Sequence, residues 1–159
     1  MLKRTKAKPK ARIKRASQKD VPRLKRKLKA LLYPKIKERD GNTCFSSGRG
    51  DLFGSGWHAG HLFPAGSHSA TMWHPRNIHS QSYHANINLG GDGARYSEAF
   101  IRRYGIEFFN EMASASKPTK KWAAWELELL IEKIQEGLEA YEEYYSETYG
   151  PRLSVASKP

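Results

Sequence analysis

The chain has 159 residues, which is enough for one domain with a substantial core and a tail. A single cysteine excludes an internal disulfide framework. There is no run of about 18 apolar residues, so we expect neither a membrane span nor a secretory signal and place the protein in a cytoplasm. The formal net charge is +12, which is typical of proteins that bind polyanions.

The positive charge is concentrated at the N-terminal end. Residues 1–39 contain 17 Lys and Arg but only two acidic residues, Asp20 and Glu38, whereas the rest of the chain is slightly acidic. Such a local concentration favours a polyanionic partner held by this end of the chain. Residues 1–18 alternate basic residues with Ala, Pro and Thr and show no apolar periodicity, which predicts a disordered basic arm.

A helix is expected from Asp20, whose side chain can cap it, with Pro22 in the first turn. Pro34 should end or kink this helix. The apolar residues that recur at helical spacing are Val21, Leu24, Leu28, Leu31 and Leu32. The basic residues that fall mostly off this stripe, and that we expect to contact nucleic acid, are Lys25, Arg26, Lys27 and Lys29.

The middle of the chain predicts a small sheet. Residues 40–56 are rich in Gly, Ser and Asn, which indicates turns with one short strand at 51–53. A strand over 57–63 would deliver His61, and residues 64–72 form a loop of small residues. A second extended segment over 73–81 would carry Asn77, and a short helix over 82–89 would end at Gly90.

The C-terminal half is expected to be helical. Two helices are predicted over 94–104 and 106–115, separated by Gly105 as a helix cap. After a break at 117–119, one long helix should run over 120–149, with one apolar stripe and one acidic face. The acidic face is either solvated or a partner for the basic helix, and it consists of Glu132, Glu136, Glu139, Glu142 and Glu143.

All six histidines lie between Trp57 and Asn86, which is unusual for residues that only pack a core. Imidazole can take up a proton near neutral pH and can bind a divalent metal. Clustered with Asn77 and Asn86, the histidines indicate a metal-assisted acid–base site. The order of a strand with His61, a loop, Asn77 and a helix with Asn86 is the layout of a ββα-metal finger.

Each residue type of this finger suits hydrolysis of a phosphodiester. A neutral His61 can deprotonate water, and a divalent cation neutralises charge that grows at the phosphate. The amide oxygen of Asn86 is a hard ligand that suits Mg²⁺ or Mn²⁺. Asn77 can pin the loop and hold the histidine ring in its working tautomer. We therefore expect an α+β fold: a basic arm over 1–18, a helix, the finger and following helices over 19–116, a long helix over 117–150 and a flexible tail over 151–159.

Several segments together resemble the phage NinG/Rap recombination proteins, members of the HNH (His-Me finger) endonucleases. They are Ala59-Gly-His61, Arg76-Asn-Ile-His-Ser-Gln81, Asn86, and the run from Tyr96 to Gly105. The resemblance implies a metal-dependent nuclease for branched or recombining DNA, acting in the host cytoplasm. By position, His61 matches the general base, Asn77 the middle asparagine and Asn86 the metal ligand. The basic residues of these segments, Arg76, Arg102 and Arg103, are further candidates for DNA contact.

Two departures from the family pattern bear on metal binding. Relatives usually carry two Cys-x-x-Cys pairs for a structural zinc, but here they read Cys44-Phe-Ser-Ser47 and Ser82-Tyr-His-Ala85. We therefore expect no structural zinc, and packing instead by Trp57, Phe63, Trp73 and Tyr83. Many HNH enzymes also have an acidic ligand just before the base, where this chain has Gly60. His58 could supply that ligand only if the strand bulges, because alternation points it away from His61.

The remaining histidines and the function itself leave alternatives open. His68 could reach the phosphate or metal, or be an exposed loop residue, and His74 is expected at the surface. His79 packs or hydrogen-bonds locally, and His84 belongs to a helix surface. Besides the endonuclease, the chain could be a non-catalytic DNA-binding recombination or assembly protein that keeps the finger as a scaffold. Symmetric cutting of both strands would call for a homodimer.

Overall fold

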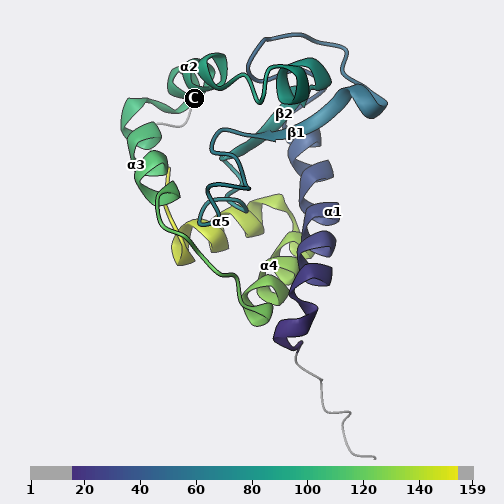
Figure 1. The fold of residues 1–159 in the computed structure, drawn as a ribbon, viewed down its shortest axis with the longest axis vertical. Helices are drawn as coiled ribbons and strands as arrows, with labels where there is room; N and C mark the ends of the chain where they lie inside the picture. Colours follow the sequence, from purple (N-terminus) through teal and green to yellow (C-terminus); the bar gives the residue numbers. More distant parts are fainter. Residues whose placement is uncertain (1–15, 154–159) are drawn as a thin grey trace, which may run out of the picture.

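The computed structural model describes residues 16–153 (Figure 1). Residues 1–15 of the predicted basic arm and 154–159 of the predicted tail lie outside this range. The fold is α+β, mostly helical around one two-stranded antiparallel sheet in the described part. The main elements are α1 (Val21–Asp40), β1 (Trp57–His61), β2 (Ile78–Ser82), α2 (Gly93–Tyr104), α3 (Ile106–Ser116), α4 (Ala124–Glu136) and α5 (Leu138–Thr148).

Helix α1 buries an apolar stripe against α4, which lies alongside it in Figure 1. The four fully buried residues of α1 are Leu24, Leu28, Leu32 and Ile36. The helix continues through Pro34 to Asp40, contrary to the prediction that Pro34 ends or kinks it. Proline removes one hydrogen bond, but buried residues on both sides hold this helix together, and Pro34 itself is exposed. Asp20 caps no helix and instead accepts hydrogen bonds from Ser17 in the turn before α1.

The long C-terminal helix of the prediction is two helices, α4 and α5. Gly137 separates them with φ 146° and ψ 166°, a conformation that residues with a Cβ rarely adopt. The break redirects α5 so that Tyr141 and Tyr145 reach the loop between the strands. Their hydroxyls donate to the carbonyls of Trp73 (2.8 Å) and Ala70 (3.1 Å). Both helices therefore pack residues into the same core, which a single straight helix would reach only in part.

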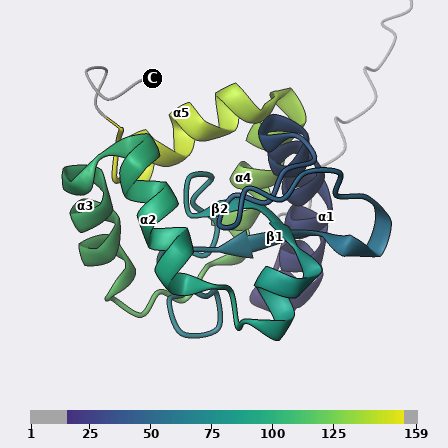
Figure 2. The ribbon, with the colours of Figure 1, turned by 90° about the horizontal axis from the view of Figure 1, so that it is seen from above.

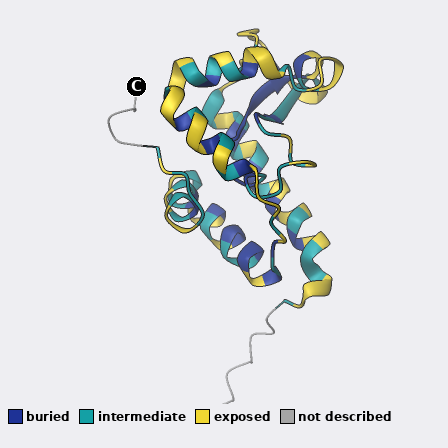
Figure 3. Cartoon of the chain, turned by 60° about the vertical axis from the view of Figure 1, so that its left-hand side comes forward, coloured by how far each residue is buried: buried dark blue, intermediate teal, exposed yellow. Residues whose placement is uncertain are grey.

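The sheet lies between two groups of helices, with α1, α4 and α5 on one side and α2 and α3 on the other (Figures 1 and 2). The α2–α3 turn at Gly105 (φ 89°) is the cap that the sequence predicts. The aromatic core that these two helices form under the sheet consists of Leu62, Tyr96, Phe100, Tyr104, Phe108 and Met112. β2 is buried along its whole length, whereas β1 is mostly half-buried, and Figure 3 shows both among helices whose outer faces are exposed.

The sheet is shorter than predicted. Its register pairs His61 with Ile78, Gly60 with His79 and His58 with Gln81. Asn77 therefore lies just before β2, and residues 51–53 form no strand. The short helix after β2 is one π-helical turn, η3 (His84–Asn88). Within residues 16–153, no helix combines the length and apolar character needed to cross a membrane.

Candidate active site

Asn77 ties together the two ends of the loop between the strands. Its Oδ1 accepts a hydrogen bond from the backbone N–H of Phe63 (2.9 Å), and its Nδ2 donates to the carbonyls of Phe63 and Thr71 (both 3.1 Å). The side chain is completely buried. These bonds allow Asn77 to pin the loop, as the sequence suggests. Asn77 does not contact the His61 ring with them; it holds the backbone on both sides of the loop that follows His61.

His61 is the last residue of β1, and its ring lies against α1. Its Nε2 is 3.1 Å from the carbonyl oxygen of Met72 and 3.4 Å from the hydroxyl of Tyr33. Because a carbonyl only accepts, Nε2 carries the proton and Nδ1 keeps a free lone pair. Burial lowers the pKa of His61 to about 4, against the opposing effect of the Met72 carbonyl. The imidazole is therefore neutral at pH 7, the form that a general base requires.

His58 and Asn86 meet on the opposite face of β1. The Nε2 of His58 donates to the carbonyl of Ser55 (2.9 Å), so its Nδ1 accepts from the Asn86 amide nitrogen (3.0 Å). The strand has no bulge here, because His58 pairs in register with Gln81. His58 therefore points away from His61, as alternation requires, and it orients the Asn86 amide.

A groove of about 410 Å³ is lined on one side by α1 and on the other by residues that include His58 and Asn86, but not His61. Lys29, Tyr33 and Lys37 line its helix wall, because residues at four-residue intervals share one face of a helix. Lys37 donates to the carbonyl of Trp57 (2.9 Å), and its ammonium lies 4.8 Å from the centre of the indole ring. The opposite wall includes His58 and Asn86. The groove is thus lined by the side chains of Lys29 and Lys37 and by the Asn86 amide, whose oxygen is a hard donor.

Tyr33 and Lys37 were not among the residues predicted for the site. The four-residue spacing from Lys29 is a signal that could have identified them. Tyr33 matters because its hydroxyl connects the groove to His61. Its pKa is raised to about 12 by burial, so the phenol stays protonated near neutral pH.

The four positions where relatives carry zinc-binding cysteines meet around Cys44. The Cys44 thiol is 3.6 Å from the hydroxyl of Ser46, and it packs in a small cluster with Leu52 and Ala85. Burial raises the pKa of Cys44, but hydrogen bonding to the thiol outweighs it and lowers the pKa to about 7. The four positions therefore lie close together, with hydroxyl and methyl groups at three of them.

A comparison with known families gives a match over most of the chain. Residues 2–143 match the family model of the bacteriophage lambda NinG protein. The chain belongs to the NinG family. The matched region contains α1, both strands and Asn86, and it reaches into α5. No curated protein and no solved structure is similar enough to this NinG-family chain to count as a match.

The packing expected in place of zinc in this NinG-family protein is only partly present. Trp73 is buried in the main core, and Trp57 packs against the Cys44 cluster. Phe63 is half-buried and contacts Phe109 instead. Tyr83 is 48% exposed, so it contributes little packing. The small cluster around Cys44 takes the place of the larger aromatic one that was expected.

The basic residues predicted to contact DNA fall into three groups. Those on α1 face outward: Arg26, Lys27 and Lys29 are exposed and Lys25 is half-buried. Arg76 is placed differently, because its guanidinium donates to Glu142 (2.6 Å) and to the Tyr104 hydroxyl (3.3 Å). Glu142 also pairs with Arg39, so one member of the acidic face is indeed a partner of α1.

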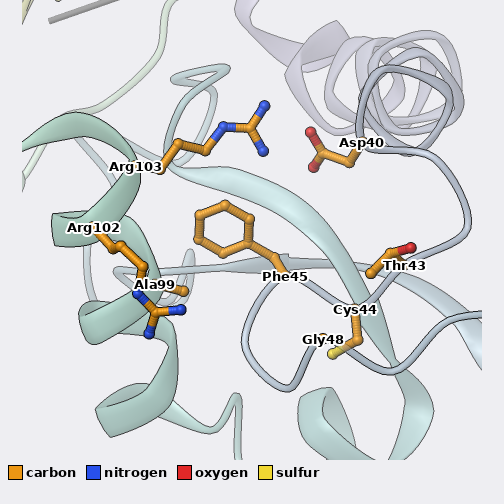
Figure 4. A pocket seen from close by; sticks show the side chains of 8 residues that line it. All are labelled: Asp40, Thr43, Cys44, Phe45, Gly48, Ala99, Arg102 and Arg103. Carbon is orange, nitrogen blue, oxygen red and sulfur yellow. The ribbon is translucent and has the colours of Figure 1, made fainter. Parts of the chain in front are cut away.

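Arg102 and Arg103 form the third group and line a separate pocket of about 320 Å³ (Figure 4). In Figure 4, Arg103 extends toward Asp40 with the ring of Phe45 below it, whereas Arg102 turns away. Arg102 is paired with Glu98 on the exposed surface of α2 (3.1 Å). Both remain accessible, but neither lines the groove of His58 and Asn86.

The other histidines have mainly structural partners. His74 is completely buried and bonds with the Pro151 carbonyl (3.0 Å), so the expectation of a surface residue is wrong. His79 is also buried, and its Nδ1 donates to Asp40 (2.8 Å). His68 contacts Ser67 in the loop. The exposed His84 lies beside Asn88 on η3 (3.2 Å).

Proposed function

We propose that this NinG-family protein is a metal-dependent DNA endonuclease of the HNH type that hydrolyses phosphodiesters in branched or recombining phage DNA. One observation carries the proposal. A neutral histidine, His61, is held at the end of β1 and is connected through the Tyr33 hydroxyl (3.4 Å) to a groove that combines two lysines with Asn86. A phosphate backbone needs such cationic walls, and hydrolysis needs a base and a cation next to them.

The residues divide the chemistry between them. His61 takes the proton of the attacking water at Nδ1, while the Met72 carbonyl fixes its ring. Asn77 keeps that carbonyl in place by closing the loop. Asn86, oriented by His58, offers Oδ1 to a divalent cation. When bound, Mg²⁺ or Mn²⁺ supplies charge neutralisation at the scissile phosphate and the leaving oxygen. Lys29 and Lys37 hold the DNA backbone at the helix wall.

The double substitution Lys29→Ala and Lys37→Ala is expected to weaken DNA binding and to make it less dependent on salt. Each phosphate contact contributes about −0.9 to the slope of log affinity against log salt, so the loss of two should flatten the slope by ~2. Fluorescence anisotropy across a salt series measures this. Lys133→Ala is the matched control, because Lys133 pairs with Glu136 away from the groove. Equal slopes for the double variant and the wild type would exclude the groove as the DNA site.

A second candidate function is non-catalytic DNA binding in recombination or assembly. The observation that favours it is Gly60, which carries no acidic ligand where many HNH enzymes have one. The basic face of α1 and the groove would then hold DNA without cutting it. This alternative predicts binding with the same salt dependence but no turnover.

Cleavage of labelled branched and linear DNA tests the proposal. The wild type is incubated with Mg²⁺, Mn²⁺ or EDTA, with His61→Ala prepared in parallel to reveal a contaminating nuclease. Metal-dependent cutting by the wild type alone supports the endonuclease, and faster cutting of branched substrates supports its substrate class. Binding without cutting under all metal conditions would select the non-catalytic function.

A further inference from the structure

Gln81 presents a buried oxygen with no hydrogen-bond partner. The residue lies in the middle of the finger on β2 and is completely buried. Its Nε2 donates to the carbonyl of Gly91 (2.9 Å) and to the hydroxyl of Ser46 (3.1 Å), whereas Oε1 has no partner. Because the Gly91 carbonyl can only accept, the amide cannot be turned around without losing that bond. Leaving such an oxygen unsatisfied costs about 1–3 kcal/mol.

This oxygen faces Gly60 and Asn86. A Cβ added at Gly60 would collide with Oε1 of Gln81 and would lie 3.1 Å from Oδ1 of Asn86. Both amide oxygens therefore point to the space above Gly60. The Asn86 amide is fixed in this sense, since its nitrogen donates to His58. Two acceptors without a donor between them are the arrangement that a cation satisfies.

We infer that Oε1 of Gln81 and Oδ1 of Asn86 together form a site for one divalent cation, in which Gln81 takes the place of an acidic residue at position 60. The inference rests on the proposed function for Asn86 and extends it to a residue on β2. Gly60 is then required, because any side chain there would fill the space between the two oxygens. Both ligands are hard oxygen donors, which suits Mg²⁺ or Mn²⁺ with several retained waters.

The two ligands are neutral amides, which sets how the site behaves. The charged side chains lining the adjacent groove are Lys29 and Lys37, and both repel a cation. The DNA phosphate would supply the negative charge that the protein lacks. Affinity of the free protein for metal should therefore be weak and should rise sharply when a carboxylate replaces the Gln81 amide.

Binding of Mn²⁺ to the full chain without DNA tests this, measured by the loss of the free Mn²⁺ signal in electron paramagnetic resonance. The variant Gln81→Met fills the same space without an oxygen and should bind at least tenfold more weakly than the wild type. Gln81→Glu keeps the oxygen and adds charge, so it should bind at least tenfold more tightly. Gln135→Met, an exposed glutamine on α4, should bind as the wild type does. Circular dichroism confirms that each variant is folded.

The results separate this inference from the proposed function. Equal Mn²⁺ affinity of Gln81→Met and the wild type would overturn the role of Gln81, even if the wild type cuts DNA with metal. Absence of Mn²⁺ binding in both the wild type and Gln81→Glu would also overturn it. Graded binding in a protein that never cuts DNA would support the cation site and reject the endonuclease.

Discussion

Replacing His61 with alanine is expected to lower metal-dependent cleavage by a factor of ~10² to 10⁴, which is the usual contribution of a positioned general base. The reason is that His61 combines a neutral imidazole with a ring fixed by Met72 and connected to the groove through Tyr33. DNA affinity should change little, because the proposed backbone contacts come from lysines of α1. Single-turnover cleavage and anisotropy measure the two effects separately.

The matched control is His84→Ala, since His84 belongs to the same finger but is exposed on η3. It should cut at the rate of the wild type. If His61→Ala retains the wild-type rate while folded, another residue is the base. If it loses DNA binding as well, His61 acts in binding and the division of roles proposed above is wrong.

Acidification from pH 7 to pH 5 is expected to remove several kcal/mol of folding free energy. His61, His74 and His79 each have a pKa lowered to about 4, mainly by burial, from the ordinary histidine value of 6.5. Between pH 6.5 and 4 the unfolded chain therefore binds more protons than the folded one, so stability falls as the pH falls. At pH 5 each buried histidine costs about 2 kcal/mol, and three together approach the total stability of a typical domain.

Urea denaturation at a series of pH values measures this loss. His74→Gln removes one of the three groups and should reduce the slope of stability against pH between 5 and 6.5 by about one proton. His84→Ala should leave the slope unchanged, because His84 is exposed. Unfolding midpoints that stay constant from pH 7 to pH 5 would contradict the prediction. Asp40 acts in a separate window: hydrogen bonds from His79 and Arg39 outweigh the effect of burial and hold its pKa well below its usual range, so its contribution is lost only below about pH 4.

Much of the fold follows from local patterns in the sequence. The apolar stripe of α1 and the cap at Gly105 rest on short-range spacing, and the structure places both as expected. His61 lies on β1 as predicted, whereas Asn77 lies just before β2 and not on it. Where tertiary packing overrides a local rule, the prediction was wrong. Pro34 sits inside a helix because the packed core holds both sides of it, and Gly137 breaks a helix because α5 packs better when redirected.

The candidate site was harder to predict in full, because the α1 wall of its groove comes from residues that are distant in sequence from β1. Tyr33 and Lys37 reach the finger only because α1 packs across it. Arg76 has the positive charge that DNA binding requires, but its guanidinium is paired with Glu142, which lies far along the chain. Gln81 belongs to a segment that carries the family resemblance, but the sequence does not indicate its role, since only the register of the two strands brings its amide over Gly60.

The loop that fixes His61 is held largely by residues of the C-terminal part of the chain, which are synthesised after the loop itself. Its carbonyls at Ser69, Ala70 and Trp73 accept hydrogen bonds from Trp122, Tyr145 and Tyr141. The nearby Met72 carbonyl is the one that orients the His61 ring. During synthesis, β1 and β2 leave the ribosome well before α5, so the nascent sheet lacks these anchors. The order of translation would thus delay the ordering of His61, and with it the proposed activity, until the C-terminal helices are complete.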